Sequence, residues 1–110
     1  MSKLAENKYF LVLGFSGGEN VYGGVIFNSQ VNQKLAPEIK CYHMPISHEK
    51  YSFLEHKCFV DCSRLKTASP HKLLKGKYLG NVDEEDLSLI TQTVCSSPRE
   101  AKAHLALFGL

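Results

Sequence analysis

Hydrophobic and polar residues alternate in short runs through the first half of the chain, a pattern typical of β-strands. An apolar, aromatic-rich run over 9–15 stops at a polar, glycine-rich cluster over 16–20, and a second run follows over 21–27. Because such a cluster favours a turn, residues 8–29 are predicted to form a β-hairpin. Two consecutive glycines in its second strand, at 23–24, predict a bulge or a close backbone approach, devices that bend a sheet toward a barrel.

Three further strands are predicted, separated by polar loops over 28–37 and 47–56. Residues 39–44 alternate and end next to a proline, residues 57–65 form the next strand, and residues 77–82 form a short last one. In the strand 57–65 alternate residues share a face. One face carries Cys58, Val60 and Cys62, and the opposite face carries Phe59, Asp61 and Ser63.

The second half of the chain predicts helices that begin at capping residues. Residues 69–76 predict a short helical turn with serine as its cap and proline in its first turn. Asp83 is suited to cap a longer helix, because the acidic residues after it favour the positive end of a helix dipole. The spacing of Leu87, Ile90 and Val94 predicts one buried face on that helix.

A break at 96–98 separates this helix from a last one. Ser97 and Glu100 are predicted to form a capping box at its start, and the helix is predicted to run to about Phe108. The order of the elements predicts an α+β domain, mainly β, in which a small curled sheet or barrel is closed by C-terminal helices.

Length and composition agree with one folded domain over residues 1–110. Of these 110 residues 44% are hydrophobic and 22% are charged, so one small core is expected and wholesale disorder is not. A formal net charge of +2 excludes a binder held by bulk charge alone. No apolar run approaches the roughly 20 residues of a membrane span, and no signal-peptide pattern is present. We therefore expect a soluble, cytoplasmic protein.

The cysteines give little indication of a metal site. Because no export signal is present, reduced thiols are expected. Two of the four are four residues apart, and on a strand they would lie about 13 Å from each other, which is too far for one zinc ion without a bend. No metal and no cofactor are therefore predicted, and buried apolar cysteine is the favoured interpretation. The four residues are Cys41, Cys58, Cys62 and Cys95.

Positive charge is concentrated in the middle of the chain. Residues 57–77 contain six basic side chains against one acidic side chain, whereas residues 78–110 are acidic overall. A patch that attracts phosphate is one interpretation, and an ordinary solvated surface is the other. The basic residues are Lys57, Arg64, Lys66, Lys72, Lys75 and Lys77.

Three motifs, in their order along about residues 8–95, resemble the MazF/PemK-type toxin superfamily. Pro-Ile-Ser at 45–47 is similar to the family's Pro-Ile-Thr/Ser at a strand end. Residues 58–65 are similar to its strand signature, in which an aspartate precedes a basic and then a hydrophobic residue. Residues 79–87 are similar to its Leu-Gly entry into a closing helix. The resemblance implies a single domain with an SH3-like barrel of about five to seven strands, usually as a homodimer.

Members of that superfamily are often metal-independent endoribonucleases, so the resemblance implies a toxin–antitoxin protein that cleaves single-stranded RNA and has an antitoxin partner. In such a reaction a base assists the 2′-hydroxyl, an acid protonates the leaving oxygen, and a cation stabilises the developing charge. Active members commonly carry Arg-Pro early in the second strand, where this chain has Val-Tyr-Gly-Gly at 21–24. The alternatives are a catalytically inactive member that binds nucleic acid or a protein partner, and an unrelated small barrel that scaffolds an assembly.

The resemblance assigns candidate roles to individual residues. Ser47 would hydrogen-bond phosphate or substrate, or else cap a turn. Asp61 would be catalytic. Alternatively, it would form an ion pair with a nearby basic side chain or accept a hydrogen bond from the backbone in a tight corner. Arg64 would contact phosphate, or else be a surface arginine, and Lys66 and Lys72 would lie at the edge of the nucleic-acid-binding site.

Three histidines remain without an assigned role. His43, His48 and His56 flank the Pro-Ile-Ser segment, and they are candidates to converge near Asp61. A histidine beside an aspartate and a serine would suggest a catalytic triad, but that arrangement is defined by spatial geometry.

Apolar residues outside the predicted core favour an interface between two copies. A core of this size would not bury all of them, and leftover apolar patches tend to become interfaces. These residues are Phe27, Tyr51, Phe53 and the segment 105–108.

Overall fold

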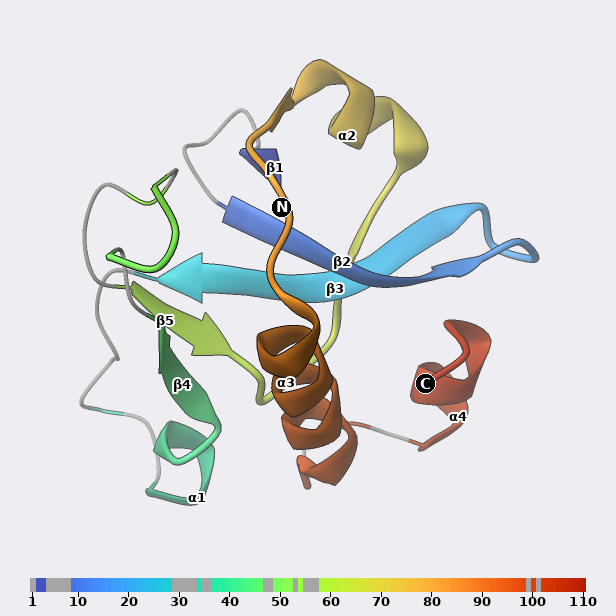
Figure 1. Cartoon of the computed structure of the whole chain (residues 1–110). Coiled ribbons are helices and arrows are strands. Elements are labelled where there is room, and N and C mark those ends of the chain that lie inside the picture. The colour runs from blue at the N-terminus through green and yellow to red at the C-terminus, as the bar shows by residue number, and fades with distance from the viewer. Residues whose placement is uncertain are drawn as a thin grey trace.

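The structure, a computed structural model, is an α+β domain built on one antiparallel sheet (Figure 1). It describes residues 2–3, 9–28, 34, 37–46, 49–52, 54, 58–98, 100 and 102–110. The strands are β1 (Ser2–Lys3), β2 (Tyr9–Ser16), β3 (Val21–Asn28), β4 (His43–Ile46), β5 (Cys58–Asp61), β6 (Lys66–Ala68) and β7 (Lys77–Tyr78). The helices are α1 (Pro37–Lys40), α2 (Pro70–Lys75), α3 (Glu84–Ser96) and α4 (Lys102–Leu107).

The sheet is open. Its strands follow the order β4-β5-β3-β2-β1-β7, and β6 pairs with β3 beside this path. Among the described strands no pairing joins the end strands β4 and β7, so the predicted closure into a barrel is wrong for this part of the chain. The α+β class is confirmed, and the sheet is antiparallel.

The predicted hairpin is confirmed as β2 and β3, which pair from Tyr9 with Phe27 to Ser16 with Val21. The register shifts between Val12 and Gly14. The irregularity therefore lies in β2, opposite the two glycines that predicted it in β3.

The predicted strand 57–65 is interrupted. β5 ends at Asp61 and β6 begins at Lys66, and both pair antiparallel with β3. Residues 62–65 leave the ladder between them, and we call residues 61–65 the β5–β6 corner. This interruption was not predicted, and it changes the surroundings of most of the candidate site residues.

Two other strand predictions are wrong in extent. The predicted strand 39–44 is replaced by α1 followed by β4. Pro37 stands in the first turn of α1, where its fixed φ is favourable, and Pro45 is tolerated because β4 lies at the sheet edge. β7 covers only two residues of the predicted 77–82. Gly80 has a φ of 150°, a conformation that L residues rarely adopt.

The predicted helix caps are present on α2 and α3. Ser69 Oγ accepts a hydrogen bond from the Lys72 N–H at 3.1 Å, and Asp83 Oδ1 accepts one from the Asp86 N–H at 2.8 Å. α4 ends before Gly109, whose φ of 77° suits a helix stop.

The predicted capping box of α4 is wrong. α4 begins at Lys102, and the two residues of the proposed box bind the β5–β6 corner instead. Ser97 Oγ donates to the Ser63 carbonyl oxygen at 2.5 Å, and Glu100 Oε2 accepts from the Leu65 N–H at 2.7 Å.

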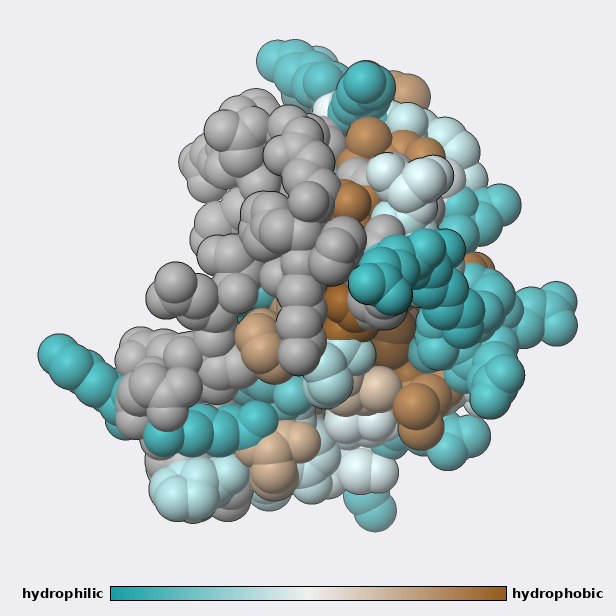
Figure 2. Space-filling view, turned by 60° about the vertical axis from the view of Figure 1, so that its left-hand side comes forward, coloured by the Kyte–Doolittle hydropathy of each residue, from teal (hydrophilic) through white to brown (hydrophobic). Residues whose placement is uncertain are grey.

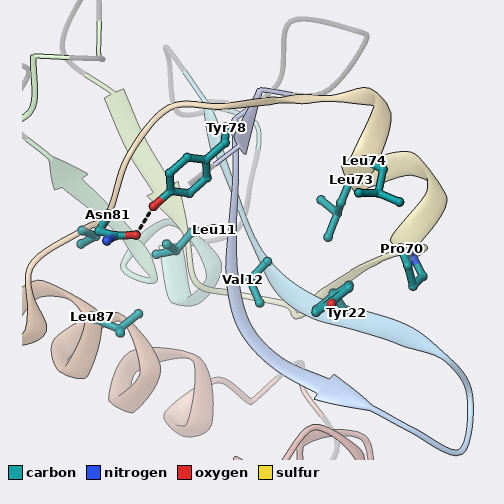
Figure 3. A pocket seen from close by; sticks show the side chains of 10 residues that line it. Leu11, Val12, Tyr22, Pro70, Leu73, Leu74, Tyr78, Asn81 and Leu87 are labelled. Carbon is teal, nitrogen blue, oxygen red and sulfur yellow. Dashed lines mark hydrogen bonds between the residues drawn. The ribbon is translucent and has the colours of Figure 1, made fainter.

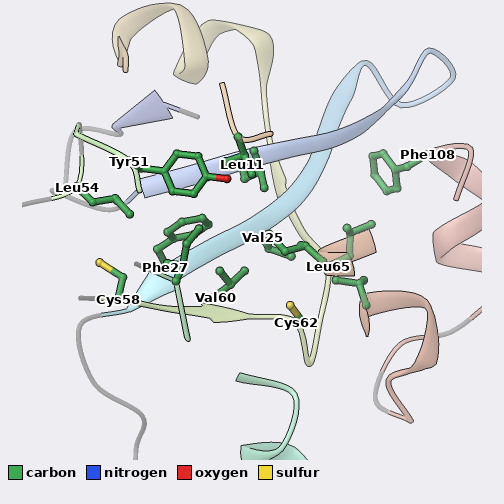
Figure 4. Close-up of a cluster of buried hydrophobic side chains, with 14 of the residues drawn as sticks. Leu11, Val25, Phe27, Tyr51, Leu54, Cys58, Val60, Cys62, Leu65 and Phe108 are labelled. Atoms are coloured by element: carbon green, nitrogen blue, oxygen red, sulfur yellow. The ribbon is translucent and has the colours of Figure 1, made fainter. Parts of the chain in front are cut away.

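The core lies between one face of the sheet and the C-terminal helices. α3 crosses that face (Figure 1), where its Ile90 and Val94 are buried, and Leu105 of α4 is buried as well. The buried cluster extends from Tyr51 at one end to Phe108 at the other (Figure 4).

Burial of this cluster corrects the argument for an interface between copies. Phe27, Tyr51, Leu105 and Phe108 are all buried in the core, so they are not leftover surface, whereas Leu107 of the same segment is 47% exposed. Phe53 lies outside the described residues. Within the part of the chain that the structure describes, no helix is both long and apolar enough to cross a membrane.

Candidate functional site

The β5–β6 corner and the first residue of β6 contain three of the residues singled out by the sequence. Asp61 ends β5, Arg64 lies in the corner, and Lys66 begins β6. Lys72 lies on α2, the next element along the chain. Ser47, His48 and His56 lie outside the described residues.

Asp61 stabilises the turn of its own corner. Its Oδ1 accepts a hydrogen bond from the Ser63 N–H at 3.1 Å and one from the Ser63 hydroxyl at 2.5 Å. Aspartate commonly bonds the backbone two residues ahead in this way. In the described residues no ion pair joins Asp61 to Arg64 or Lys66. Of the alternatives, the geometry therefore favours a carboxylate bonded to backbone in a tight corner.

His43 is brought next to Asp61 by strand pairing. The two residues are opposite each other on β4 and β5, and His43 Nε2 lies 3.6 Å from Asp61 Oδ1. A serine triad needs the imidazole between the hydroxyl and the carboxylate. Here the Ser63 hydroxyl donates to the carboxylate, and the His43 side chain is only 4% exposed. This histidine, serine and aspartate therefore do not form a catalytic triad.

The strand face that carries Phe59, Asp61 and Ser63 is partly closed. Ser63 is buried, and its carbonyl oxygen accepts the hydrogen bond from Ser97. Glu100 Oε2 also accepts from the Leu65 N–H, and Glu100 Oε1 lies 2.5 Å from His104 Nδ1. The corner is thus fixed to the segment between α3 and α4, while the Arg64 side chain is exposed.

Two basic side chains at or next to the corner, Arg64 and Lys66, and one on α2, Lys72, are available to an anion. Arg64 and Lys72 are exposed, and Lys66 is half-buried. Within the described part of the chain, none of these three cations forms an ion pair. Figure 2 shows hydrophilic side chains interspersed with apolar ones on one face of the molecule.

A charged cluster at the start of α3 was not predicted. Lys50 Nζ lies 2.6 Å from Asp83 Oδ2 and 3.0 Å from Asp86 Oδ2. These contacts raise the pKa of Lys50 and lower that of Asp83. The Tyr51 hydroxyl donates to Asp86, and burial followed by this bond raises the pKa of Tyr51 to about 12. Every one of these groups has a partner. The cluster therefore holds Lys50 and Tyr51 against the start of α3, and it offers no unpaired side chain to act as a general base.

The buried cysteines are poor nucleophiles. Burial and the charge of Asp61 raise the pKa of Cys62 to about 12, and burial raises the pKa of Cys58. Cys41 and Cys95 are exposed, and none of the four cysteines is in a disulfide. Among the described residues no group of three histidine, cysteine or acidic side chains is placed to hold a metal ion.

Comparison with known proteins does not assign the chain to a family. No family model matches it, and no curated protein matches it significantly.

Proposed function

We propose that the chain is a MazF/PemK-like protein of a toxin–antitoxin pair that binds single-stranded RNA through Arg64. The observation that carries the proposal is an exposed arginine, without an ion pair to any described residue, on a corner held by Asp61 and by Ser97 and Glu100. A guanidinium group suits phosphate because it donates two parallel hydrogen bonds. A fixed backbone beneath it lowers the entropy lost on binding.

The lysines that follow Arg64 support binding to a polyanion. Lys66 and Lys72 carry no ion pair in the described residues, so their charge is available at the edge of the site. Each phosphate contact releases counterions and adds about one unit to the salt dependence of binding.

The proposal has two forms, with and without RNA cleavage. In the first form the protein is a metal-independent endoribonuclease in which Asp61 and Ser47 act on the substrate. The second form, binding without cleavage, is favoured by the bonds that Asp61 already makes to Ser63 and by the burial of His43. The absence of Arg-Pro at 21–24 favours the second form too.

The finer fold and the partners belong to the same proposal. An SH3-like arrangement is supported by β3, which pairs with β2 along one edge and with β5 and β6 along the other. The proposals of an antitoxin partner and of a homodimer rest on the resemblance to the MazF/PemK-type superfamily. A monomeric mass by light scattering at micromolar concentration would exclude the homodimer.

Binding and cleavage of RNA test the proposal separately. Single-stranded RNA oligonucleotides are titrated with the protein at several salt concentrations, and Arg64→Ala is expected to weaken binding about tenfold and to flatten the salt dependence by about one unit. Lys102→Ala, an exposed change on α4, is the matched control and is expected to do neither. Equal, small effects of both variants would mean that the positive charge is an ordinary solvated surface.

The same RNA is then incubated with and without EDTA. Cleavage that survives EDTA supports the endoribonuclease form, whereas bound but intact RNA supports the form without cleavage. RNA that neither binds nor is cleaved contradicts both forms.

A further inference from the structure

An apolar groove lies away from the β5–β6 corner. Its volume is about 700 Å³. It lies among β2, the start of β3, α2, and the segment from β7 to the first turn of α3 (Figure 3). The residues that matter most for the argument are Leu11, Val12, Leu73, Leu74, Tyr78 and Leu87.

Several of the apolar side chains in this groove are open to solvent. Leu74 is 84% exposed, Tyr78 is 64% exposed and Val12 is 37% exposed. Exposed apolar patches on soluble domains commonly mark interaction surfaces. The exposed Phe15 continues this apolar surface along β2, where its ring packs 4.7 Å from that of Tyr22.

One edge of β2 opens into the groove. β1 pairs with β2 only at Tyr9 and Phe10. From Leu11 to Ser16 the outer edge of β2 has no ladder partner in the described part of the chain. A strand edge presents rows of N–H and C=O groups that pair readily with another strand, and proteins often block such edges with lysine or proline. The segment 11–16 contains neither.

The groove has a wall on each side of that edge. Leu11 and Tyr78 lie on one side of β2, and Val12, Leu73 and Leu74 lie on the other (Figure 3). Successive side chains of a strand point to opposite faces. A strand added beside β2 would therefore place alternate side chains against the two walls, which is the geometry of peptide recognition by β-augmentation.

Charge distinguishes the two walls. Lys72 and Lys75 flank the lining residues Leu73 and Leu74 of α2, both are exposed, and in the described residues neither forms an ion pair. The opposite wall ends at the acidic start of α3, with Glu84 and Glu85 exposed. A segment bound in the groove would complement the α2 lysines if it carried acidic residues on the side that faces α2.

We propose that this groove and the outer edge of β2 form a docking site for an extended segment of a partner protein. The segment pairs with β2 from Leu11 onward, carries apolar residues at alternate positions, and carries acidic residues on its α2-facing side. Backbone hydrogen bonds to β2 supply general affinity, and the two apolar walls and the lysines supply specificity. The proposal does not depend on RNA binding by Arg64.

A peptide library provides the test. Random twelve-residue peptides displayed on phage are selected on the purified full chain, and the enriched peptides are synthesised. Alternating apolar residues and an excess of acidic residues are expected. Binding of the best peptide, measured by fluorescence anisotropy, is expected to fall at least tenfold in Leu74→Glu and severalfold in Lys75→Glu.

Matched controls are available on other surfaces. Leu89→Glu changes a leucine that is 51% exposed on α3 outside the groove, and Lys102→Glu changes an exposed lysine on α4. Both are expected to bind the peptide as the parent protein does, and so is Arg64→Ala. If Leu74→Glu fails to fold, as judged by circular dichroism, Leu74→Ser repeats the measurement.

Hydrogen exchange locates the bound peptide. Peptide binding is expected to slow the exchange of amides in the segment 11–16 of β2. Peptides without the alternating pattern, an equal loss in Leu74→Glu and Leu89→Glu, or protection elsewhere would overturn the proposal. Without peptide, a slowing of the exchange of β2 amides as the protein concentration rises would assign the groove to a second copy of the chain. Competition by a poly-uridine oligonucleotide that persists in Arg64→Ala would assign it to RNA, and either result would also overturn the proposal.

Discussion

The Tyr51 hydroxyl donates a hydrogen bond to Asp86 Oδ2 across 35 residues of sequence, and this bond fastens the loop before β5 to the first turn of α3. The same hydroxyl accepts a hydrogen bond from the Asp83 N–H at 3.2 Å, and the tyrosine is only 6% exposed. Lys50 binds both aspartates from the solvent side. A single phenol thus satisfies a backbone group at the α3 cap and a carboxylate one turn later.

Tyr51→Phe is expected to destabilise the protein by about 1–2 kcal/mol. The ring stays buried, but the variant loses a hydrogen bond to a charged group and leaves the Asp83 N–H without its acceptor. Urea denaturation measures the change in the free energy of unfolding. Tyr78→Phe is the control, because Tyr78 is exposed and its hydroxyl bonds Asn81, which is exposed too. This variant is expected to cost less than about 0.5 kcal/mol.

The stabilisation from Tyr51 is expected to disappear at alkaline pH. Its pKa is raised from 10.0 to about 12 in the folded protein, so folding favours the neutral hydroxyl. This contribution is fully present below pH 10 and is lost as the pH rises toward 12. The difference in unfolding free energy between the parent protein and Tyr51→Phe should therefore shrink between pH 9 and 11.5. Cys62 titrates in the same range, but it is present in both proteins. A difference that stays constant would contradict the assignment.

Gly23→Ala is expected to disturb the docking of the C-terminal segment. A β-carbon at Gly23 would lie 2.7 Å from the ring of Phe108, which is closer than packed atoms approach. Phe108 is buried, so it cannot move away without losing core contacts, and we expect a cost of about 1–3 kcal/mol. Thermal and urea unfolding measure it. Gly18→Ala, in the open hairpin turn where a β-carbon would meet nothing within 4 Å, is expected to change stability by less than about 0.5 kcal/mol. Equal effects would contradict this packing.

Local sequence signals were sufficient to predict the β2–β3 hairpin and the starts of α2 and α3. The hairpin follows from two apolar runs around a glycine-rich turn, and the starts of α2 and α3 follow from Ser69 and Asp83 as caps. The strand expected over 39–44 failed because alternation over so few residues does not distinguish a strand from a helical turn that starts at Pro37.

The site was less predictable, because its geometry depends on contacts between distant segments. Ser97 and Glu100 have the spacing of a capping box, yet they bind Ser63 and Leu65, which precede them by about 35 residues. Nothing local to either segment indicates that pairing. The interruption of β5 and β6 is equally hidden, since residues 57–65 alternate as an unbroken strand would. Asp61 was identified as a residue of interest, but whether it bonds substrate or its own backbone depends on that interruption.

Substitutions at Asp61 distinguish these two roles. Asp61→Ala removes the acceptor of the Ser63 N–H and hydroxyl, and because Ser63 is buried these donors lose their partner. We expect a cost of about 1–3 kcal/mol by urea denaturation. Asp61→Asn keeps a carbonyl oxygen for the same bonds, so it is expected to cost less than about 1 kcal/mol.

RNA binding separates a positioning role of Asp61 from a catalytic one. If Asp61 only shapes the β5–β6 corner, Asp61→Asn should bind RNA as the parent protein does, and Asp61→Ala should weaken binding because Arg64 is no longer held in place. Loss of cleavage in Asp61→Asn, with stability and RNA affinity unchanged, would instead show that the negative charge acts on the substrate, since the amide keeps the hydrogen bonds but cannot accept a proton as a base. That result would reverse our preference for binding without cleavage.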